Sequence, residues 1–473
     1  MRSIDKIRWQ SRVGPARAAL SVPGRARDVV SYTVLERLID NLASRLARTG
    51  MRQGDTVGLL VSDSLLHIAT MLALEDLGAV TASLTSETPP TGLRLDAVVT
   101  DQAATKVSCP AIRIGPDWLE GDGRRAPDAG NAARSSVSAV CRIMLTSGTT
   151  GAAKAVALTH DMIAQRLNSY TYVFGPDFAC HARMLCCFGM ASSLGYLFCI
   201  HVLTRGGMFC IPESSVGRTL RKIERYEIET MAASSATLAE IWAAAQVDDA
   251  SAAPLQLVLT AGSLLPPALA DGVRRSICSR LVNFYGTTET GVVASAPVEM
   301  LDLETGAAGY VVPGVEVETT GGPHEGRVRI RGPANAKGYL GGGKEGAAFF
   351  EGEWFYPGDL GHLSQDGLLS IRGRESNVVN LGGTKTTLET IEMNFAGLPL
   401  VKDAAVLLAP DALGIDRVIV FIVPGEGWLK EEFESHYRKE VSRDFWPIKI
   451  VTAAAIPRSP SGKVDRHGLS SLL

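Results

Sequence analysis

Helical and strand-like segments alternate along the N-terminal part of the chain, and this alternation limits the folds open to it. Apolar residues in 34–46 recur at helical spacing, Thr33 with Glu36 matches a capping box, and Gly50 is placed to end the helix. Then DTVGLLV predicts a buried strand, DSLLHIATMLALEDLG predicts a helix ending at Gly78, and AVTASL predicts another strand. Units of this kind predict a mostly parallel sheet covered by helices.

The alternation continues and then changes towards the C-terminus. Strands are expected at RIMLTS, RMLCCF, GMFCI, LQLVLTAG and RLVNFYG, and helices at TLRKIERYEIET and PALADGVRRSIC. Past Thr305 the pattern becomes short, glycine-separated β segments such as GRVRIRG and GLLSIRGR. The last hundred or so residues follow the order helix, strand, strand, helix, strand, which suffices for a small α+β domain. We place the boundary at Gly373–Asn377, between a body of residues 1–375 and a C-terminal domain of residues 376–473.

Length and composition describe a large globular chain without a marked charge. Its 473 residues, 46% of them hydrophobic, allow roughly two or three domains. A formal net charge of −3, with both signs scattered, offers no basic field for nucleic acid. The eight cysteines contain no CxxC pair, which disfavours a disulfide framework or a zinc site and favours a reduced, cytoplasmic location. The arginine-bearing N-terminus lacks the apolar run of a secretory signal, and a surface arm is favoured over an organellar transit segment.

One uncharged segment, Met184–Thr204, is about as long as a membrane span. It contains two serines, two glycines and His201, and an arginine flanks it at each end. A buried strand followed by a buried helix accounts for these residues better than a span does. We therefore expect no membrane insertion.

The stretch MLTSGTTGAAKAVALTH, residues 144–160, combines glycines, hydroxyls and one lysine between two apolar runs. A Walker-type loop needs four residues between its glycines and a Ser or Thr after its lysine. Here two residues separate Gly148 from Gly151, and Ala155 follows Lys154, so that interpretation fails. Exposed backbone N–H groups, hydroxyls and a positive charge nevertheless suit a polyphosphate. A polar turn between two elements is the alternative.

Three further stretches carry side chains that could take part in chemistry. NFYGTTETG, residues 283–291, offers the aromatic face of Tyr285, the hydroxyl of Thr288 and the carboxylate of Glu289, an oxygen ligand suited to Mg²⁺. EWFYPGDLGHLSQDGLLSIRGRESN contains Asp359 at a turn, and PRSPSGKVDR places a glycine beside a lysine near the C-terminus. Taken one at a time, these are a strand end, a turn cap and a solvated tail.

Together the four stretches resemble the signatures of the adenylate-forming superfamily, which includes acyl-CoA and aryl-CoA synthetases, luciferases and the adenylation domains of peptide synthetases. They occur in the family's order between Met144 and Arg466, and weaker similarity extends over nearly the whole chain. The resemblance implies an α/β fold: a large N-terminal domain of sheet-and-helix subdomains plus a β-rich subdomain, with a small mobile α+β lid at the C-terminus. It also implies that ATP and Mg²⁺ are bound.

The resemblance assigns the nucleotide to residues of the first three stretches. They are Thr146, Ser147, Gly148, Thr149, Thr150, Gly151, Lys154, Asn283, Phe284, Tyr285, Gly286, Thr287, Asp359 and Arg374. Tyr285 would face the adenine. Asp359 would accept both ribose hydroxyls, with Arg374 as a second ribose contact. The loop that contains Lys154 would hold the departing pyrophosphate.

Three residues receive catalytic roles from the resemblance. Lys463 would bridge carboxylate and phosphate oxygens during adenylation, Thr288 would lie near the reacting phosphate, and Glu289 would bind Mg²⁺. Members of the superfamily rotate the lid between two half-reactions. Ser376 occupies the hinge position of that rotation.

In the second half-reaction a thiol would attack the acyl adenylate. The matching face of the lid is NLGGTK, in which Gly382 and Gly383 leave room for a pantetheine arm. The resemblance implies CoA or the phosphopantetheine of a carrier protein as the acceptor.

The acid is expected to be one without an amino group. The resemblance places Phe188, Gly189, Ala261 and Gly262 at the acyl pocket. Amino-acid-activating relatives have an aspartate after the phenylalanine, whereas Gly189 follows it here, so a buried ammonium would lack a partner. An aryl or a short- to medium-chain acyl acid fits this pocket.

A metal site at His181 with Cys186 and Cys187 is disfavoured, because adjacent strand residues point to opposite faces. Core packing is the better interpretation of these thiols.

The leading hypothesis is therefore an ATP-dependent acid–thiol ligase that acts on a small carboxylic acid. Two alternatives stay open: a catalytically silent nucleotide-binding scaffold with the same fold, and an adenylating ligase whose acceptor is not a thiol.

Overall fold

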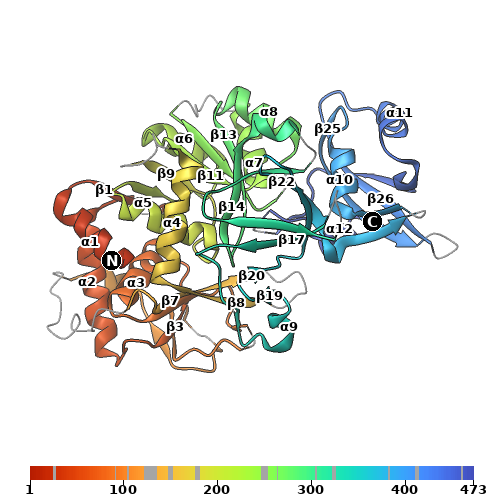
Figure 1. The fold of residues 1–473 in the computed structure, drawn as a ribbon. Coiled ribbons are helices and arrows are strands. Elements are labelled where there is room, and N and C mark those ends of the chain that lie inside the picture. The colour runs from red at the N-terminus through yellow and green to blue at the C-terminus, as the bar shows by residue number, and fades with distance from the viewer. Residues whose placement is uncertain are drawn as a thin grey trace. The chain divides into compact units, whose positions relative to one another are not determined.

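The computed structural model describes residues 1–24, 28–90, 92–103, 106–121, 136–146, 153–175, 182–246, 254–263, 265–303, 306–321, 326–381, 384–410, 415–459 and 462–473. The chain forms two compact units, each built from several stretches of sequence (Figure 1). Unit 1 comprises Met1–Ala232, Thr287–Val292 and Arg331–Phe355. Unit 2 comprises Ala233–Gly286, Val293–Ile330 and Tyr356–Leu473.

Unit 1 contains a mixed sheet in which parallel pairs predominate. Its strand order is β18 (Tyr339–Leu340), β8 (Lys154–Thr159), β7 (Val140–Thr146), β4 (Val80–Ser83), β3 (Thr56–Leu60), β5 (Ala97–Thr100) and β6 (Ala111–Arg113). The strands from β7 to β6 pair in parallel, whereas β8 runs antiparallel to both β7 and β18. The helices α2 (Tyr32–Arg48) and α3 (Ser64–Asp76) connect the first strands and pack on each other. The predicted parallel pairing of these strands is confirmed.

A second group of strands in unit 1 has the order β2 (Val29–Ser31), β1 (Ala18–Ser21), β10 (Met208–Cys210), β9 (Arg183–Cys186) and β11 (Thr230–Ala233). The pairs β1–β10, β10–β9 and β9–β11 are parallel. The described residues of this unit also form α1 (Ser3–Val13), the 3₁₀ turn Pro116–Leu119, α4 (His160–Phe174), α5 (Ser193–Thr204), α6 (Val216–Arg225), α9 (Gly343–Ala347), β19 (Phe350–Glu351) and β20 (Trp354–Phe355).

Unit 2 starts with α7 (Ser235–Ala245), the parallel strands β12 (Leu257–Thr260) and β13 (Leu281–Thr287), and α8 (Pro267–Ser276). A β-rich region follows, as predicted past residue 305. Its strands are β14 (Gly291–Pro297), β15 (Ala307–Val311), β16 (Glu316–Thr320), β17 (Gly326–Arg331), β21 (Asp359–Leu363) and β22 (Leu368–Arg374), with 3₁₀ turns at Val298–Leu303 and Glu375–Asn377. Antiparallel pairs join β14 to β15, β15 to β22, β22 to β21, and β21 to β17.

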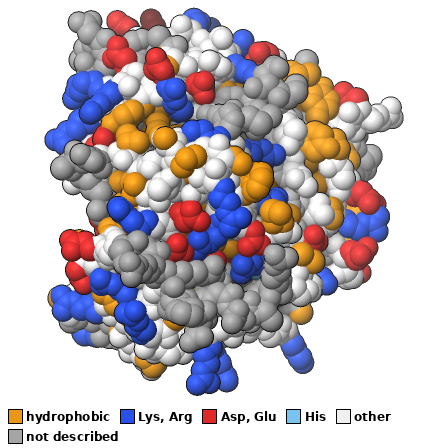
Figure 2. Space-filling view, turned by 90° about the vertical axis from the view of Figure 1, so that its left-hand side faces the viewer, with side chains coloured by type: hydrophobic (Ala, Val, Ile, Leu, Met, Phe, Trp, Pro, Cys, Tyr) orange, Lys and Arg blue, Asp and Glu red, His pale blue; other side chains and the backbone are white. Residues whose placement is uncertain are grey.

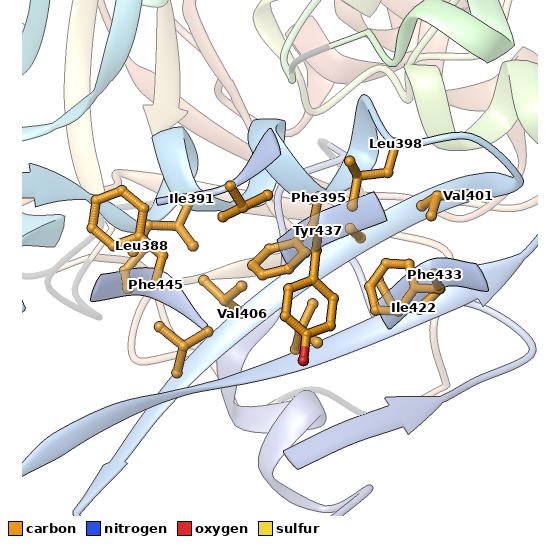
Figure 3. Close-up of a cluster of buried hydrophobic side chains, with 14 of the residues drawn as sticks. Leu388, Ile391, Phe395, Leu398, Val401, Val406, Ile422, Phe433, Tyr437 and Phe445 are labelled. Carbon is orange, nitrogen blue, oxygen red and sulfur yellow. The ribbon is translucent and has the colours of Figure 1, made fainter. Parts of the chain in front are cut away.

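The C-terminal part of unit 2 contains the predicted order helix, strand, strand, helix, strand, and adds a hairpin before it and a short helix after it that were not predicted. It contains the hairpin β23 (Val378–Leu381) and β24 (Thr384–Thr387), then α10 (Leu388–Ala396), β25 (Val401–Pro410), β26 (Asp416–Pro424), α11 (Lys430–Glu440), a 3₁₀ turn at Arg443–Phe445, β27 (Lys449–Thr452) and α12 (Arg466–Ser470). Side chains from α10, α11, β25 and β26 form one buried apolar cluster, in which the rings of Phe395, Phe433 and Tyr437 pack against one another (Figure 3). This cluster shows how a small α+β region builds its own core. The mixed α/β fold class is confirmed, and the boundary at 375/376 stays a prediction.

Two predicted details of the helices are wrong. The N-cap of α2 is Ser31, whose hydroxyl accepts the Val34 N–H at 3.3 Å, while the Thr33 hydroxyl donates to the Pro15 carbonyl at 3.0 Å. Several hydroxyls precede this helix, and spacing alone selected the wrong one. The helix expected to extend to Thr230 ends instead at Arg225, and β11 begins at Thr230.

The predicted surface arm at the N-terminus is also wrong. Residues 3–13 form α1, in which Ile4 and Ile7 are buried and Arg8 forms ion pairs with acidic residues of α2 and α3. Within the part of the chain that the structure describes, no helix has the length and apolar character to cross a membrane. The uncharged segment forms β9 and then α5, the predicted buried strand and helix. Figure 2 shows basic and acidic side chains interspersed on the face it displays.

Candidate functional site

The ends of the predicted phosphate loop are held by a hairpin. Antiparallel pairing of β7 with β8 sets Thr146 directly opposite Lys154. Thr146 comes just before the glycine-rich segment, and Lys154 follows it. Five predicted nucleotide-binding residues of the loop lie outside the described residues: Ser147, Gly148, Thr149, Thr150 and Gly151. The phosphate-binding role of the loop therefore stays a prediction, and the structure describes only Thr146 and Lys154 at its two ends.

Lys154 lies on aromatic rings. Its Nζ atom is 3.5 Å from the centroid of the Phe349 ring and 4.9 Å from that of the Tyr339 ring. The antiparallel pairing of β18 with β8, in which Tyr339 opposes Val156, brings Tyr339 next to Lys154. An ammonium over an aromatic face is attracted by the negative potential of the ring. Two segments that are distant in sequence thus position the lysine of the loop.

Glu289, the predicted metal ligand, is buried and held through both its side chain and its backbone. The Tyr339 hydroxyl donates to Glu289 Oε1 at 2.5 Å. The Glu289 carbonyl accepts from Arg166 Nη2 at 2.9 Å and from the Ala336 N–H at 2.7 Å. A single carboxylate is a donor set that Mg²⁺ accepts, because this ion commonly takes one or two carboxylates together with phosphate oxygens of the substrate.

Arg166 of α4 anchors the segment around Glu289 and was missed by the sequence analysis. Its guanidinium is fully buried and also donates to the Thr288 carbonyl at 2.8 Å and to the Ala334 carbonyl at 2.9 Å. Burial lowers the pKa of Arg166 to about 10. A signal was present in the sequence, since Arg166 falls at helical spacing among the apolar residues Ile163 and Tyr170.

The side chain of Thr287 organises the turn that presents Thr288 and Glu289. Its hydroxyl oxygen accepts the N–H groups of Glu289 and Thr290, both at 3.2 Å. This local hydrogen bonding of a threonine hydroxyl is typical of turns. The nucleotide contacts assigned to Thr287 and Thr288 stay predictions.

In unit 2, the predicted ribose-binding residues lie together. Asp359 and Arg374 face each other in the β21–β22 pair, and Arg374 Nε is 2.7 Å from Asp359 Oδ1. The Tyr285 hydroxyl donates to Asp359 Oδ2. Burial raises the pKa of the Asp359 carboxyl, while Arg374, the Tyr285 hydrogen bond and the charge of Lys463 lower it. Three residues therefore act on this carboxylate: Arg374, from the same stretch of sequence as Asp359, and Tyr285 and Lys463, from two other stretches.

Lys463 is exposed and follows a tight turn. The Ser459 N–H donates to the Lys463 carbonyl, and Gly462 has a φ of +82°, which favours glycine. A Cβ at Gly462 would come within 3.0 Å of Ser263 Oγ, so the turn packs closely against this serine.

Arg458 anchors this turn and was also missed by the sequence analysis. It donates to the Gly462 carbonyl at 3.0 Å and pairs with Asp403 at 2.8 Å. These contacts hold the backbone just before Lys463.

The residues assigned to the nucleotide from β13 have roles in the fold as well. Asn283 Nδ2 donates to the Ala308 carbonyl at 3.0 Å, and Phe284 is buried. Gly286, at the end of the strand, is exposed. Their contacts with a nucleotide stay predictions.

The four predicted pocket residues belong to different units. In unit 1, Phe188 is buried, and a Cβ at Gly189 would meet no atom within 4 Å, so there is open space beside this glycine. In unit 2, Ala261 is buried and Gly262 has a φ of +91°. The assignment of all four to an acyl pocket stays a prediction.

Of the disfavoured metal cluster, His181 lies outside the described residues, and Cys186 is buried. Among the residues that the structure describes, no three His, Cys, Asp or Glu side chains are grouped to hold a metal ion.

The predicted hinge and thiol face lie next to each other in sequence. Ser376 is exposed in the 3₁₀ turn between β22 and β23. Gly382 and Gly383 lie outside the described residues, between the paired positions Leu381 and Thr384. Both assignments stay predictions.

Comparison with known proteins identifies the family to which the chain belongs. The sequence model of the AMP-binding enzymes matches residues 7–340, and that of the AMP-binding enzyme C-terminal domain matches residues 390–463. The chain is 24% identical to 4-coumarate–CoA ligase of Vanilla planifolia, over 96% of this chain and 90% of the relative. It is 25% identical to the fatty acid–[acyl-carrier-protein] ligase MmaC of Mycobacterium marinum, over 93% and 92% of the two chains.

Among solved structures, the fold is similar to that of o-succinylbenzoate CoA synthetase from Bacillus subtilis in complex with its acyl-adenylate intermediate, with a TM-score of 0.81 and 21% identity. The similarity covers 98% of this chain and 97% of that one. With a family match that covers more than half of its length, this chain belongs to the AMP-binding enzymes.

Proposed function

We propose that the protein is an ATP-dependent acid–thiol ligase that activates a carboxylic acid as an acyl adenylate. The observation that carries the proposal is the set of groups around Asp359. A carboxylate suited to ribose hydroxyls is paired with Arg374, bonded to Tyr285, and close enough to Lys463 for the lysine charge to lower its pKa. In this proposal Lys463 is the cation beside the nucleotide, where charge develops as the phosphoryl group is transferred.

In the first half-reaction, a carboxylate oxygen attacks the α-phosphorus of ATP, the new P–O bond forms, and pyrophosphate leaves with the electron pair of the broken bond. Lys463 would stabilise negative charge on the reacting oxygens. Glu289 would hold Mg²⁺, which supplies charge neutralisation at the phosphates when bound. Lys154, with the loop it follows, would bind the departing pyrophosphate.

In the second half-reaction, a thiolate attacks the acyl carbonyl and AMP leaves, giving a thioester. We assign the acceptor to CoA or to a carrier-protein phosphopantetheine. Relatives of both kinds support this choice: one is named as a CoA ligase and another as an acyl-carrier-protein ligase. The face at Gly382 and Gly383, the hinge at Ser376 and a lid of residues 376–473 belong to this proposal.

The proposed acid carries no α-amino group. Gly189 offers no carboxylate to an ammonium, so the charge of an α-amino acid would lack a partner at this position. An aryl or a short- to medium-chain acyl acid is therefore the proposed substrate class.

The test is pyrophosphate–ATP exchange over a panel of carboxylic acids, followed by mass detection of thioester after CoA or a phosphopantetheinylated carrier is added. We expect exchange with at least one aryl or acyl acid and none with α-amino acids. No exchange with any acid would favour the silent scaffold. Exchange that yields an amide or ester and no thioester would favour a non-thiol acceptor.

Variants of the two lysines divide the roles. Lys463→Ala should lose exchange but still convert a supplied acyl adenylate to thioester. Lys154→Ala should weaken the use of ATP less than Lys463→Ala does. Equal loss of both half-reactions in Lys463→Ala, or a larger loss in Lys154→Ala, would contradict this division.

A further inference from the structure

We propose that Tyr339 is a positioning residue that holds the metal ligand Glu289 through its hydroxyl and the phosphate-loop lysine Lys154 through its ring. This inference rests on the proposed function, because it concerns how the chain prepares a site for ATP and Mg²⁺. All the residues concerned belong to unit 1.

The hydroxyl of Tyr339 fixes the orientation of the Glu289 carboxylate. It donates to Oε1 at 2.5 Å, and the carboxylate is buried, so this hydrogen bond forms where water competes little. The backbone of Glu289 is fixed separately by Arg166 and by the Ala336 N–H. With the backbone held, the remaining freedom of the ligand is in its side-chain torsions, and the Tyr339 hydroxyl restricts them. Partners that orient a metal ligand in this way strongly affect metal affinity.

The ring of Tyr339 takes part in placing Lys154. The Lys154 ammonium lies 4.9 Å from the Tyr339 centroid and 3.5 Å from that of Phe349. The two rings meet edge to face, with centroids 5.8 Å apart. A lysine that rests on two rings is attracted by their negative potential and loses part of its torsional freedom.

Register makes this arrangement specific. Tyr339 opposes Val156 in the β18–β8 pair, two residues from Lys154 along the strand, and alternate residues of a strand share a face. The side chains of Lys154 and Val156 therefore point to the same face of β8, where Tyr339 meets them. The tyrosine can contact the lysine with its ring while its hydroxyl extends to the carboxylate.

The hydroxyl and the ring can be removed separately. Tyr339→Phe keeps the ring and removes the hydrogen bond to Glu289, whereas Phe349→Leu removes the ring nearest to Lys154 and leaves that hydrogen bond in place. Tyr339→Leu removes both contacts of the tyrosine. Phe350→Leu is the matched control, since Phe350 packs edge-on against the Tyr339 ring at 5.3 Å and is assigned no role with nucleotide or metal.

The experiment measures equilibrium binding of ATP by calorimetry, once in EDTA and once over a series of Mg²⁺ concentrations, with pyrophosphate exchange as a second readout. Tyr339→Phe should raise the Mg²⁺ concentration for half-maximal ATP binding about tenfold or more and leave affinity in EDTA unchanged. Phe349→Leu should weaken binding in EDTA about two- to fivefold and leave the Mg²⁺ dependence unchanged. Tyr339→Leu should show both effects, and Phe350→Leu neither.

A purely structural role of Tyr339 predicts a different result. Its variants would then lower thermal stability and the amount of active protein, with an unchanged Mg²⁺ midpoint. Wild-type protein with Mg²⁺-dependent ATP binding, and a folded Tyr339→Phe variant with the same midpoint, would overturn the role of Tyr339 and leave the proposed function intact. Wild-type protein that binds no ATP would refute the proposed function and this inference with it.

Discussion

Replacement of Arg166 by methionine should impair catalysis far more than folding. Arg166 holds the carbonyls of Thr288 and Glu289 from inside the protein, and methionine fills similar space without donors. In the variant, the Glu289 carbonyl still accepts a hydrogen bond from the Ala336 N–H. The cost therefore falls on the carbonyls of Thr288 and Ala334, which lose the hydrogen bonds donated by the guanidinium. At about 1–3 kcal/mol for each carbonyl, the gross loss is about 2–6 kcal/mol.

Relief of a buried charge opposes this loss. Burial lowers the pKa of Arg166 from 12.5 to about 10, and at about 1.4 kcal/mol for each unit of pKa this lowering corresponds to about 3–4 kcal/mol of unfavourable burial. Removal of the guanidinium recovers that amount, since replacing a buried charge by an apolar side chain often costs little. The net loss of stability in Arg166→Met should therefore be about 3 kcal/mol at most.

The Arg166→Met variant should lose more of its pyrophosphate-exchange activity than its loss of stability alone would explain. Without Arg166, the segment that presents Thr288 and Glu289 is held less firmly, and loss of such a support typically reduces metal affinity or activity about 10- to 100-fold. The assay is pyrophosphate exchange at several Mg²⁺ concentrations, beside urea denaturation of the same samples. Arg166→Lys keeps the charge without the planar fork and should fall between wild type and Arg166→Met. A folded Arg166→Met variant with wild-type exchange would refute the reasoning.

Three further predictions follow from the described side chains. Burial lowers the pKa of His67 to about 4, so the unfolded chain binds more protons than the folded one below about pH 6.5. Stability should fall by up to about 3 kcal/mol as the pH drops from 6.5 to 4; equal denaturant midpoints for wild type and His67→Gln over this range would contradict this. Arg374→Met removes the charge that lowers the pKa of Asp359, so the acid limb of ATP affinity should move to higher pH, and an unmoved limb would count against it. Gly462→Ala must adopt a φ of +82° with a Cβ 3.0 Å from Ser263 Oγ, so exchange should fall more than thioester formation from supplied adenylate, and a larger loss in thioester formation would refute it.

Local pattern was enough to predict most of the fold. Strands such as β3 and β4 are short apolar runs between turn signals, α2 has clear helical spacing, and α3 is a longer apolar run that ends at Gly78, so their type and parallel pairing follow from the sequence. The N-terminal helix was missed because its buried side is short. Ile4 and Ile7 face the interior, while Arg8 is stabilised by acids that are distant in sequence.

The residues of the candidate site that belong to one sequence motif could be predicted. The residues that hold them in place from other segments of the chain could not. Asp359 and Arg374 came from one stretch of sequence, and the hairpin β21–β22 sets them opposite each other. Tyr339 and Arg166 reach Glu289 from β18 and α4, and no local spacing connects these positions. Such contacts depend on strand order and helix packing, which a single sequence does not state directly.

The most direct test of the central claim follows oxygen from the acid. With an acid substrate of the protein labelled with ¹⁸O in its carboxylate, attack on the α-phosphorus carries one labelled oxygen into AMP when the thiol displaces it. We predict that mass spectrometry of a complete reaction will find one ¹⁸O in AMP and none in pyrophosphate. Label in inorganic phosphate, with ADP as the nucleotide product, would show attack at the γ-phosphorus and contradict adenylation.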